Sequence, residues 1–321
     1  MRIDAAVDAD ILSSEDLIPP GFPLMTVDGR PRRVGVEIEF MGPSARVAAD
    51  ALARVFGGTR HAEDPHAYRV EARGIGSLRV ETDLRHVHPQ RHRNLGLTLP
   101  PRVAAWLGTM VAPVVPRELV LNPLPMDQLE PVDQVVRALQ EAGARGRGAM
   151  LWDTLGLHFN IDPPELDAQT LVRYFKAFLL LEDELRDATA GRSVRLGLLL
   201  PPRYPATYRR RVLDPDYWPD IQGFTNDYLL ANPTRKRSLD LLPLLAHLDG
   251  DRVRSVLPHE KIGPRPVFHY RLPVAHLGRP GWNMLPDWQR WLHVERLAMD
   301  RDRLVESNAS ASKRSDLPAR A

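Results

Sequence analysis

The chain has 321 residues and no cysteine, so disulfide bonds, thiol chemistry and cysteine-ligated zinc are excluded. No stretch approaches 18 consecutive apolar residues, which argues against a membrane-spanning helix. The first 20 residues lack the basic region and the apolar run of a signal peptide. Together these absences predict a cytoplasmic protein with no membrane partner.

An excess of charge of one sign is also missing, because the formal net charge is only +2. Lysine is rare and occurs only at Lys176, Lys236, Lys261 and Lys313. The arginine-rich runs at residues 85–93, 209–211 and 235–237 lack interleaved aromatic residues and match no nucleic-acid-binding module. We therefore expect no nucleic-acid partner, and the sequence sets no oligomeric state.

Apolar residues make up 43% of the chain, enough to bury a large core. Residues 1–30 are acidic and then rich in proline and glycine, which predicts an extended arm. Residues 31–305 are expected to form one domain, with a loop-rich insertion at 191–235. The tail at 306–321 is rich in serine, alanine and arginine and is predicted to be disordered.

Residues 34–40 alternate as a β-strand, and the rest of the chain is organised around this stretch. Its apolar face comprises Val34, Val36, Ile38 and Phe40. Glu37 and Glu39 point together from the other face, and burying two like charges costs several kcal/mol without a positive partner. A divalent cation would remove that cost, whereas a half-exposed strand would leave both carboxylates in water.

Two further strands, at residues 66–72 and 77–84, are expected to form a hairpin. On the second of these strands Arg79, Glu81 and Asp83 share one face. Glu81 and Asp83 are either less certain members of the site that contains Glu37 and Glu39, or residues of an edge strand whose polar face lies in water.

Three more predicted strands carry polar residues opposite an apolar face. They cover residues 117–123, 156–162 and 267–273, and their polar faces include Glu118, His158, His269 and Arg271. Such strands predict an α+β fold in which an antiparallel β-sheet has helices packed on one face and a metal or nucleotide site on the other.

Apolar positions at helical spacing predict the helices. They cover residues 45–56 after a Ser44 cap, 101–112, 127–142, 168–187 after an Asp167 cap, 239–248 after a Ser238 cap, and 287–304. We expect the long helix 168–187 to be core scaffold. Metal binding by His86 and His88 is disfavoured, because three arginines close by would oppose a cation.

Mixed carboxylate and imidazole donors suit Mg²⁺ or Mn²⁺. The expected metal ligands are Glu37, Glu39, Glu118, His158 and His269. Arg271 beside such a metal suggests a phosphate ligand, because a guanidinium pairs with two phosphoryl oxygens.

In several of these strand motifs the chain resembles the amidoligase family. That family belongs to the carboxylate–amine ligase superfamily, together with glutamine synthetase and glutamate–cysteine ligase. Residues 34–40 resemble the opening Gly-x-Glu-x-Glu-Phe motif of that family. Residues 118–123, 157–161 and 271–273 resemble its later motifs, in the same order. The likeness spans about residues 32–300, and it departs at His269, where the family usually has glutamate.

The resemblance implies a glutamine-synthetase-like catalytic fold and an ATP- and Mg²⁺-dependent ligase. Such an enzyme joins a carboxylate to an amine, on small molecules or peptides, through an acyl phosphate. Arg271 would bind ATP and stabilise the transferring phosphoryl group, and Asp83 would be a further ligand or help to deprotonate the amine. The five expected ligands named above would hold the metals.

Two other readings stay open. A metal-dependent hydrolase could use a similar carboxylate-bearing sheet. A catalytically degenerate member of the family would bind a nucleotide or peptide without turnover, and His269 is the sequence argument for it.

Overall fold

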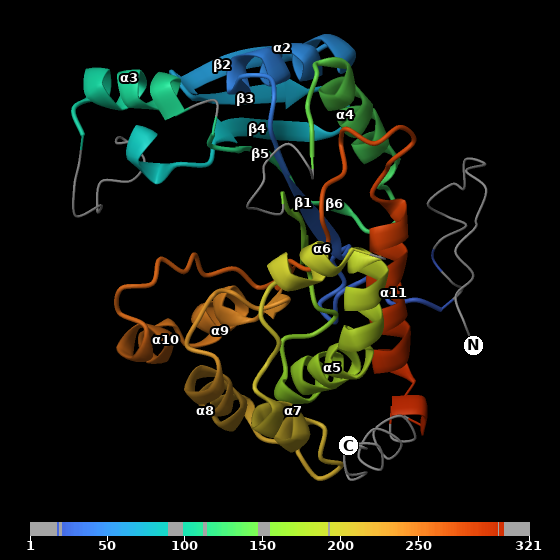
Figure 1. Ribbon diagram of the computed structural model, residues 1–321. Coiled ribbons are helices and arrows are strands. Elements are labelled where there is room, and N and C mark those ends of the chain that lie inside the picture. The colour runs from blue at the N-terminus through green and yellow to red at the C-terminus, as the bar shows by residue number, and fades with distance from the viewer. Residues whose placement is uncertain are drawn as a thin grey trace.

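The computed structural model describes residues 18, 21–88, 99–111, 114–146, 155–191, 193–300 and 302–304. The predicted tail at 306–321 and most of the predicted N-terminal arm lie outside these residues. Within them, the centre of the fold is a nine-stranded antiparallel sheet with the order β2-β3-β4-β5-β1-β7-β9-β8, and β6 pairs with β1 (Figure 1). The strands are β1 (Arg33–Phe40), β2 (Thr59–Asp64), β3 (Ala67–Ala72), β4 (Gly76–Thr82), β5 (Arg117–Leu121), β6 (Leu124–Pro125), β7 (Leu157–Ile161), β8 (Leu239–Asp240) and β9 (Phe268–Tyr270). The α+β fold with an antiparallel sheet is confirmed.

Ten α-helices and one 3₁₀ helix, η1 (Arg85–Val87), are present in the described residues. They are α2 (Ala45–Val55), α3 (Pro101–Val111), α4 (Glu130–Glu141), α5 (Ala168–Ala190), α6 (Val194–Leu199), α7 (Ala206–Val212), α8 (Ile221–Ala231), α9 (Leu242–Leu248), α10 (Gly250–Val256) and α11 (Leu285–Met299). None of these helices has the length and apolar character needed to cross a bilayer. The predicted caps of α2 and α5 are confirmed, since Ser44 and Asp167 accept backbone N–H groups of their first turns.

The strand β1 lies at the centre of the sheet and separates two environments. Its side chains Val34, Val36, Ile38 and Phe40 are fully buried. Burying each such side chain contributes about 1.5–3 kcal/mol. Helices α2 and α4 pack together, and α2 lies on β3 and β4, so one half of the apolar face is covered from this side.

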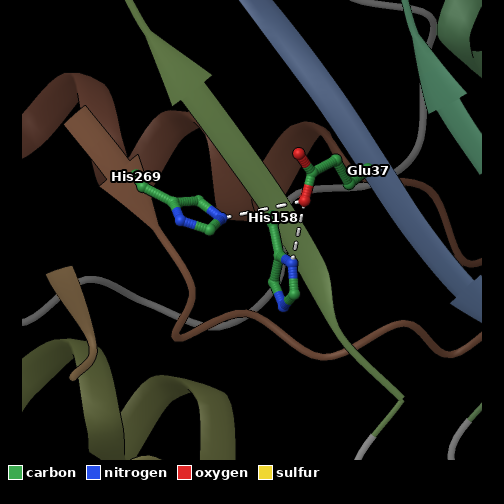
Figure 2. A group of neighbouring side chains, drawn as sticks. All are labelled: Glu37, His158 and His269. Atoms are coloured by element: carbon green, nitrogen blue, oxygen red, sulfur yellow. Dashed lines mark hydrogen bonds and ion pairs between the residues drawn. The ribbon is translucent and has the colours of Figure 1, made fainter. Parts of the chain in front are cut away.

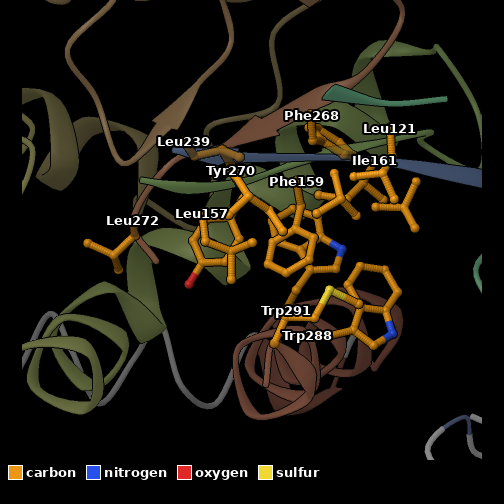
Figure 3. Packing of buried hydrophobic residues seen from close by; sticks show 14 of the residues in the cluster. Leu121, Leu157, Phe159, Ile161, Leu239, Phe268, Tyr270, Leu272, Trp288 and Trp291 are labelled. Carbon is orange, nitrogen blue, oxygen red and sulfur yellow. The ribbon is translucent and has the colours of Figure 1, made fainter. Parts of the chain in front are cut away.

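The other half of the apolar face is covered by α5 and α11, which also pack against each other. Figure 3 shows Phe159 of β7 and Tyr270 of β9 directed at Trp288 and Trp291 of α11. The ring centroids of Phe159 and Trp288 lie 5.6 Å apart, and those of Tyr270 and Trp291 lie 5.3 Å apart. This packing leaves the opposite face of β7 and β9 for polar side chains.

A buried ion pair fixes the start of β1 to α11. Arg32 donates to both carboxylate oxygens of Glu295 at 2.8 Å, and both side chains are fully buried. Trp291 and Tyr174 also donate to Glu295. Because each charged atom has a partner, the pair is tolerated in the core.

Two local predictions are wrong. The segment 191–235 is not loop-rich, because it contains α6, α7 and α8. Ser238 does not cap a helix; its side chain instead accepts a hydrogen bond from Arg186, and the next two residues pair with β9 as β8. Tertiary pairing therefore overrides the helical spacing of the apolar residues there.

The edge strand β2 was not predicted. Its sequence, Thr-Arg-His-Ala-Glu-Asp, has no apolar face, so the alternation of hydrophobic residues that reveals other strands is missing. It pairs with β3, with a register shift between Ala62 and Asp64.

Candidate metal centre

The strand register brings the predicted polar residues onto one face of the sheet. Glu37 lies directly opposite His158 on β7, and His269 lies opposite Asn160 of β7 and Asp240 of β8. Because side chains alternate along strands, all five point to the face opposite the helix-covered core.

Glu37, His158 and His269 converge on one point from three different strands (Figure 2). Their candidate ligand atoms all lie within 4.8 Å of one another, and the three residues are buried. The Oε2 atom of Glu37 lies 3.3 Å from Nδ1 of His158 and 3.7 Å from Nε2 of His269. One carboxylate oxygen thus faces both imidazoles.

The other oxygen of Glu37 is already held by donors. Asn160 donates to Oε1 at 2.8 Å, and Arg265 donates to it at 3.2 Å. Burial by itself would raise the pKa of Glu37, but the imidazoles of His158 and His269 outweigh it and hold the pKa well below its usual range. Glu37 is therefore an oriented carboxylate whose Oε2 remains available as a ligand.

The imidazole of His269 is buried. Among the described residues, neither of its ring nitrogens has a hydrogen-bond partner, and Oδ2 of the fully buried Asp240 has none either. An unsatisfied buried polar atom costs about 1–3 kcal/mol, so Nε2 of His269, which faces Glu37, calls for a ligand. A divalent cation at Nε2 of His269 and Oε2 of Glu37 would fit these donors, and the residues present are suitable for a metal.

A row of carboxylates extends from this cluster across the neighbouring strands. Glu39 lies opposite Glu118 on β5, and Glu118 lies opposite Glu81 on β4. The pKa of Glu118 is raised well above its usual range by burial and then by the negative charges of Glu37, Asp83, Glu39 and Glu81. The sheet face therefore gathers several carboxylates around Glu118, close enough for their charges to act on one another.

The predicted ligands fall into two groups. Among the described residues, the cluster within 4.8 Å consists of Glu37, His158 and His269, and it does not include Glu39 or Glu118. Glu39 instead accepts the backbone N–H of residue 156 at 2.7 Å. Glu39 and Glu118 form the adjacent carboxylate row.

The two predicted catalytic residues lie on either side of this face. Asp83 follows β4 and is exposed, yet it is close enough to raise the pKa of Glu118. Arg271 follows β9, is partly exposed, and its Nη1 lies 3.8 Å from Oδ2 of Asp240. Both side chains can therefore meet a ligand that approaches from solvent.

The histidines of the basic loop have separate positions. His88 is buried, and its two ring nitrogens lie 2.8 Å from Asp64 Oδ2 and from the carbonyl oxygen of Thr82. Both ring nitrogens of His88 are thus hydrogen-bonded within the fold. His86 is exposed. The remainder of the loop, residues 89–93, lies outside the described residues.

Sequence reasoning missed Arg265 and Asp240. Arg265 lies in a proline-rich loop before β9, where no periodic pattern marks a face. Asp240 lies in a strand of two residues that is too short to show alternation. Only the pairing of β8 with β9, which the sequence does not reveal, places Asp240 beside His269.

Residues 30–293 match the model of a family described as "Putative amidoligase enzyme". No curated protein and no solved structure matches the chain.

Proposed function

Because the chain belongs to the amidoligase family, we propose that it is a ligase that joins a carboxylate to an amine in an ATP- and Mg²⁺-dependent reaction. A substrate carboxylate oxygen attacks the γ-phosphorus of ATP, the bond to the bridging oxygen breaks, and ADP leaves. The amine nitrogen then attacks the acyl carbon, phosphate leaves, and the amine loses one proton. We also propose that the sheet corresponds to the catalytic sheet of glutamine synthetase.

The observation that carries this proposal is the convergence of Glu37, His158 and His269 beside a row of carboxylates on one sheet face. Phosphoryl transfer from ATP depends mainly on positioning and on charge neutralisation. When bound, Mg²⁺ or Mn²⁺ would neutralise charge on the phosphate oxygens. Glu37, His158 and His269 would hold one cation, and the row of Glu39 and Glu118 supports a second one close by.

The other residues of the face have roles that follow from their chemistry. The partly exposed Arg271 would pair with phosphoryl oxygens and stabilise the charge that develops during transfer. Asp83, an exposed carboxylate at the edge of the acidic row, would accept the proton that the amine loses. Asn160 and Arg265 would keep Glu37 oriented.

The test uses hydroxylamine as the amine, because it traps acyl phosphates as hydroxamates. The full chain is incubated with ATP, Mg²⁺ and a panel of amino acids and short peptides as carboxylates. We expect ADP, phosphate and hydroxamate in equal amounts, and ADP formation only when a carboxylate is present. Glu37→Gln should remove this activity, and Glu71→Gln, which changes an exposed carboxylate of β3, should retain it.

Other outcomes would select the other readings. Cleavage of amides without ATP would identify a hydrolase. Tight binding of a non-hydrolysable ATP analogue, with no turnover of any carboxylate, would identify a degenerate member. Absence of metal-dependent nucleotide binding by calorimetry would overturn the proposed ligase.

A further inference from the structure

His269 lies between two buried carboxylates, and its ring nitrogens are too far from either of them for a hydrogen bond. Its Nε2 is 3.7 Å from Oε2 of Glu37, and its Nδ1 is 3.8 Å from Oδ2 of Asp240. We propose that Asp240 is a positioning residue that holds the proton on Nδ1 of His269, and that the resulting Glu37–His158–His269 site selects a transition-metal dication such as Mn²⁺, Fe²⁺, Co²⁺ or Zn²⁺ over Mg²⁺. This inference rests on the proposed function only for the presence of a cation at Glu37.

The carboxylate of Asp240 is oriented so that one of its oxygens faces His269. Its Oδ1 accepts the backbone N–H of Leu242 at 3.1 Å, which fixes the carboxylate at the start of α9. Its Oδ2 is buried and has no hydrogen-bond partner within the described part of the chain. Cross-strand pairing places the two residues directly opposite each other. An approach of about 1 Å would give an ordinary hydrogen bond from Nδ1 to Oδ2.

Arg271 is the competing partner of Asp240, since its Nη1 also lies 3.8 Å from Oδ2. The side chain of Arg271 is 26% exposed, whereas that of His269 is only 3% exposed. Water can therefore hydrogen-bond to the guanidinium of Arg271 but not to the imidazole of His269. A hydrogen bond between Asp240 and His269 thus stabilises the fold more than one between Asp240 and Arg271.

A proton held on Nδ1 leaves the lone pair of Nε2 directed at Glu37. This is the carboxylate–histidine–metal arrangement, in which the outer carboxylate fixes the tautomer and raises the basicity of the ligand. Asp240 is fully buried, so it acts on the metal through His269 and does not bind the substrate.

The donor set then determines the class of ion. Two imidazoles and one carboxylate suit first-row transition metals, whereas Mg²⁺ prefers an octahedral set of oxygen ligands. The buried Asp240 would repel a carboxylate at position 269, and it matches an imidazole there.

Metal affinity is the first test, with Co²⁺ as a probe because its visible absorption reports its ligands. The full chain is freed of metal with a chelator and titrated with Co²⁺ without nucleotide. We expect a saturable visible band in the wild type and about 10–100-fold weaker binding in Asp240→Asn. Asp287→Asn is the matched control, a buried aspartate on α11 away from the polar face, and should bind Co²⁺ as the wild type does. Equal affinity in Asp240→Asn and wild type would overturn the role of Asp240.

The second test separates orientation from simple loss of charge. In nitrogen-detected NMR of the metal-free wild type, His269 should carry its proton on Nδ1. Asparagine at position 240 can donate to Nδ1 and should favour the opposite tautomer. A proton on Nε2 in the wild type would overturn the proposal, and this result does not depend on the folding of any variant.

Ion selectivity is the third test. The ratio of Mg²⁺ to Mn²⁺ dissociation constants should fall at least about 10-fold in His269→Glu, because an imidazole donor is replaced by an oxygen donor. An unchanged ratio would overturn the selectivity. Circular dichroism checks that each variant is folded. None of these measurements contains ATP or an amine, so a failure of ligation and a failure of metal selection are seen separately.

Discussion

Gly156 lies directly against the imidazole of His158, and a Cβ atom added to Gly156 would lie 2.3 Å from Nε2 of His158. No real Cβ contact is that short, so the ring would have to move. Gly156 also donates its N–H to Glu39 at 2.7 Å. A single residue without a side chain therefore sets the position of one ligand of the cluster and one carboxylate of the neighbouring row.

Gly156→Ala should keep the fold and weaken metal binding, because the displaced imidazole no longer faces Glu37. We expect at least about a 10-fold loss of Co²⁺ affinity, similar to the loss of an orienting contact. Gly263→Ala is the control, since no atom of the described residues lies within 4 Å of a Cβ there. If both variants bind Co²⁺ equally well, His158 is not a ligand.

Glu37→Gln should abolish metal-dependent nucleotide binding and leave the fold intact. The amide keeps the shape of the side chain but removes the charged oxygen that faces both imidazoles. Calorimetry with a non-hydrolysable ATP analogue and Mg²⁺ or Mn²⁺ measures the loss. Unchanged affinity would remove Glu37 from the site.

Arg271→Ala should lower the rate of phosphoryl transfer by about 10²–10³-fold, the typical cost of losing one group that stabilises charge in the transition state. Metal affinity should change little, because Arg271 is not among the three clustered donors. Single-turnover ADP formation and Co²⁺ titration measure the two quantities. A normal rate would show that Arg271 is structural.

Asp287 gives a pH dependence that lies away from the site. Burial raises its pKa from 3.8 to about 6, although Arg290 acts against the rise. The native state therefore binds this proton more tightly than the unfolded state does, and its contribution to stability falls as pH rises from about 4 to 6.

Asp287→Asn removes that dependence. The unfolding free energy of the variant, relative to wild type, should increase across this pH range by about 3 kcal/mol and then level off. Urea denaturation at several pH values measures it. A difference that does not change with pH would mean that Asp287 titrates normally.

Glu295→Ala should destabilise the fold strongly, because it leaves the fully buried guanidinium of Arg32 without its partner. Breaking such a pair costs about 3–5 kcal/mol. Asp251→Asn is the comparison, since Asp251 and Arg254 form an exposed pair whose loss should change stability little. Urea midpoints that shift equally in the two variants would contradict the assignment.

The sequence was informative wherever alternation reveals both a strand and its faces. In β1 the pattern of apolar and acidic residues predicted the strand, the buried face and the direction of Glu37, and all three are confirmed. Placing His158 opposite Glu37 needed the pairing of β1 with β7, which no periodicity in the sequence encodes.

The missed residues share one property. Asp240 and Arg265 reach the cluster from a two-residue strand and from a loop, where local sequence carries no period that relates a side chain to a face. Their positions depend on contacts between residues far apart in the chain. Arg265, for example, contacts Glu37, which lies 228 residues earlier. Such contacts become visible only in the folded chain.

The two-sided character of β1 also affects how the sheet assembles. A slip of one residue against β7 would turn Glu37 and Glu39 into the helix-packed core and expose Val36 and Ile38 on the acidic side. Each misplaced carboxylate would cost several kcal/mol. The acidic residues of the site therefore also disfavour any register shift by an odd number of residues. Neutralising several of these carboxylates together should therefore loosen strand alignment during folding as well as remove ligands.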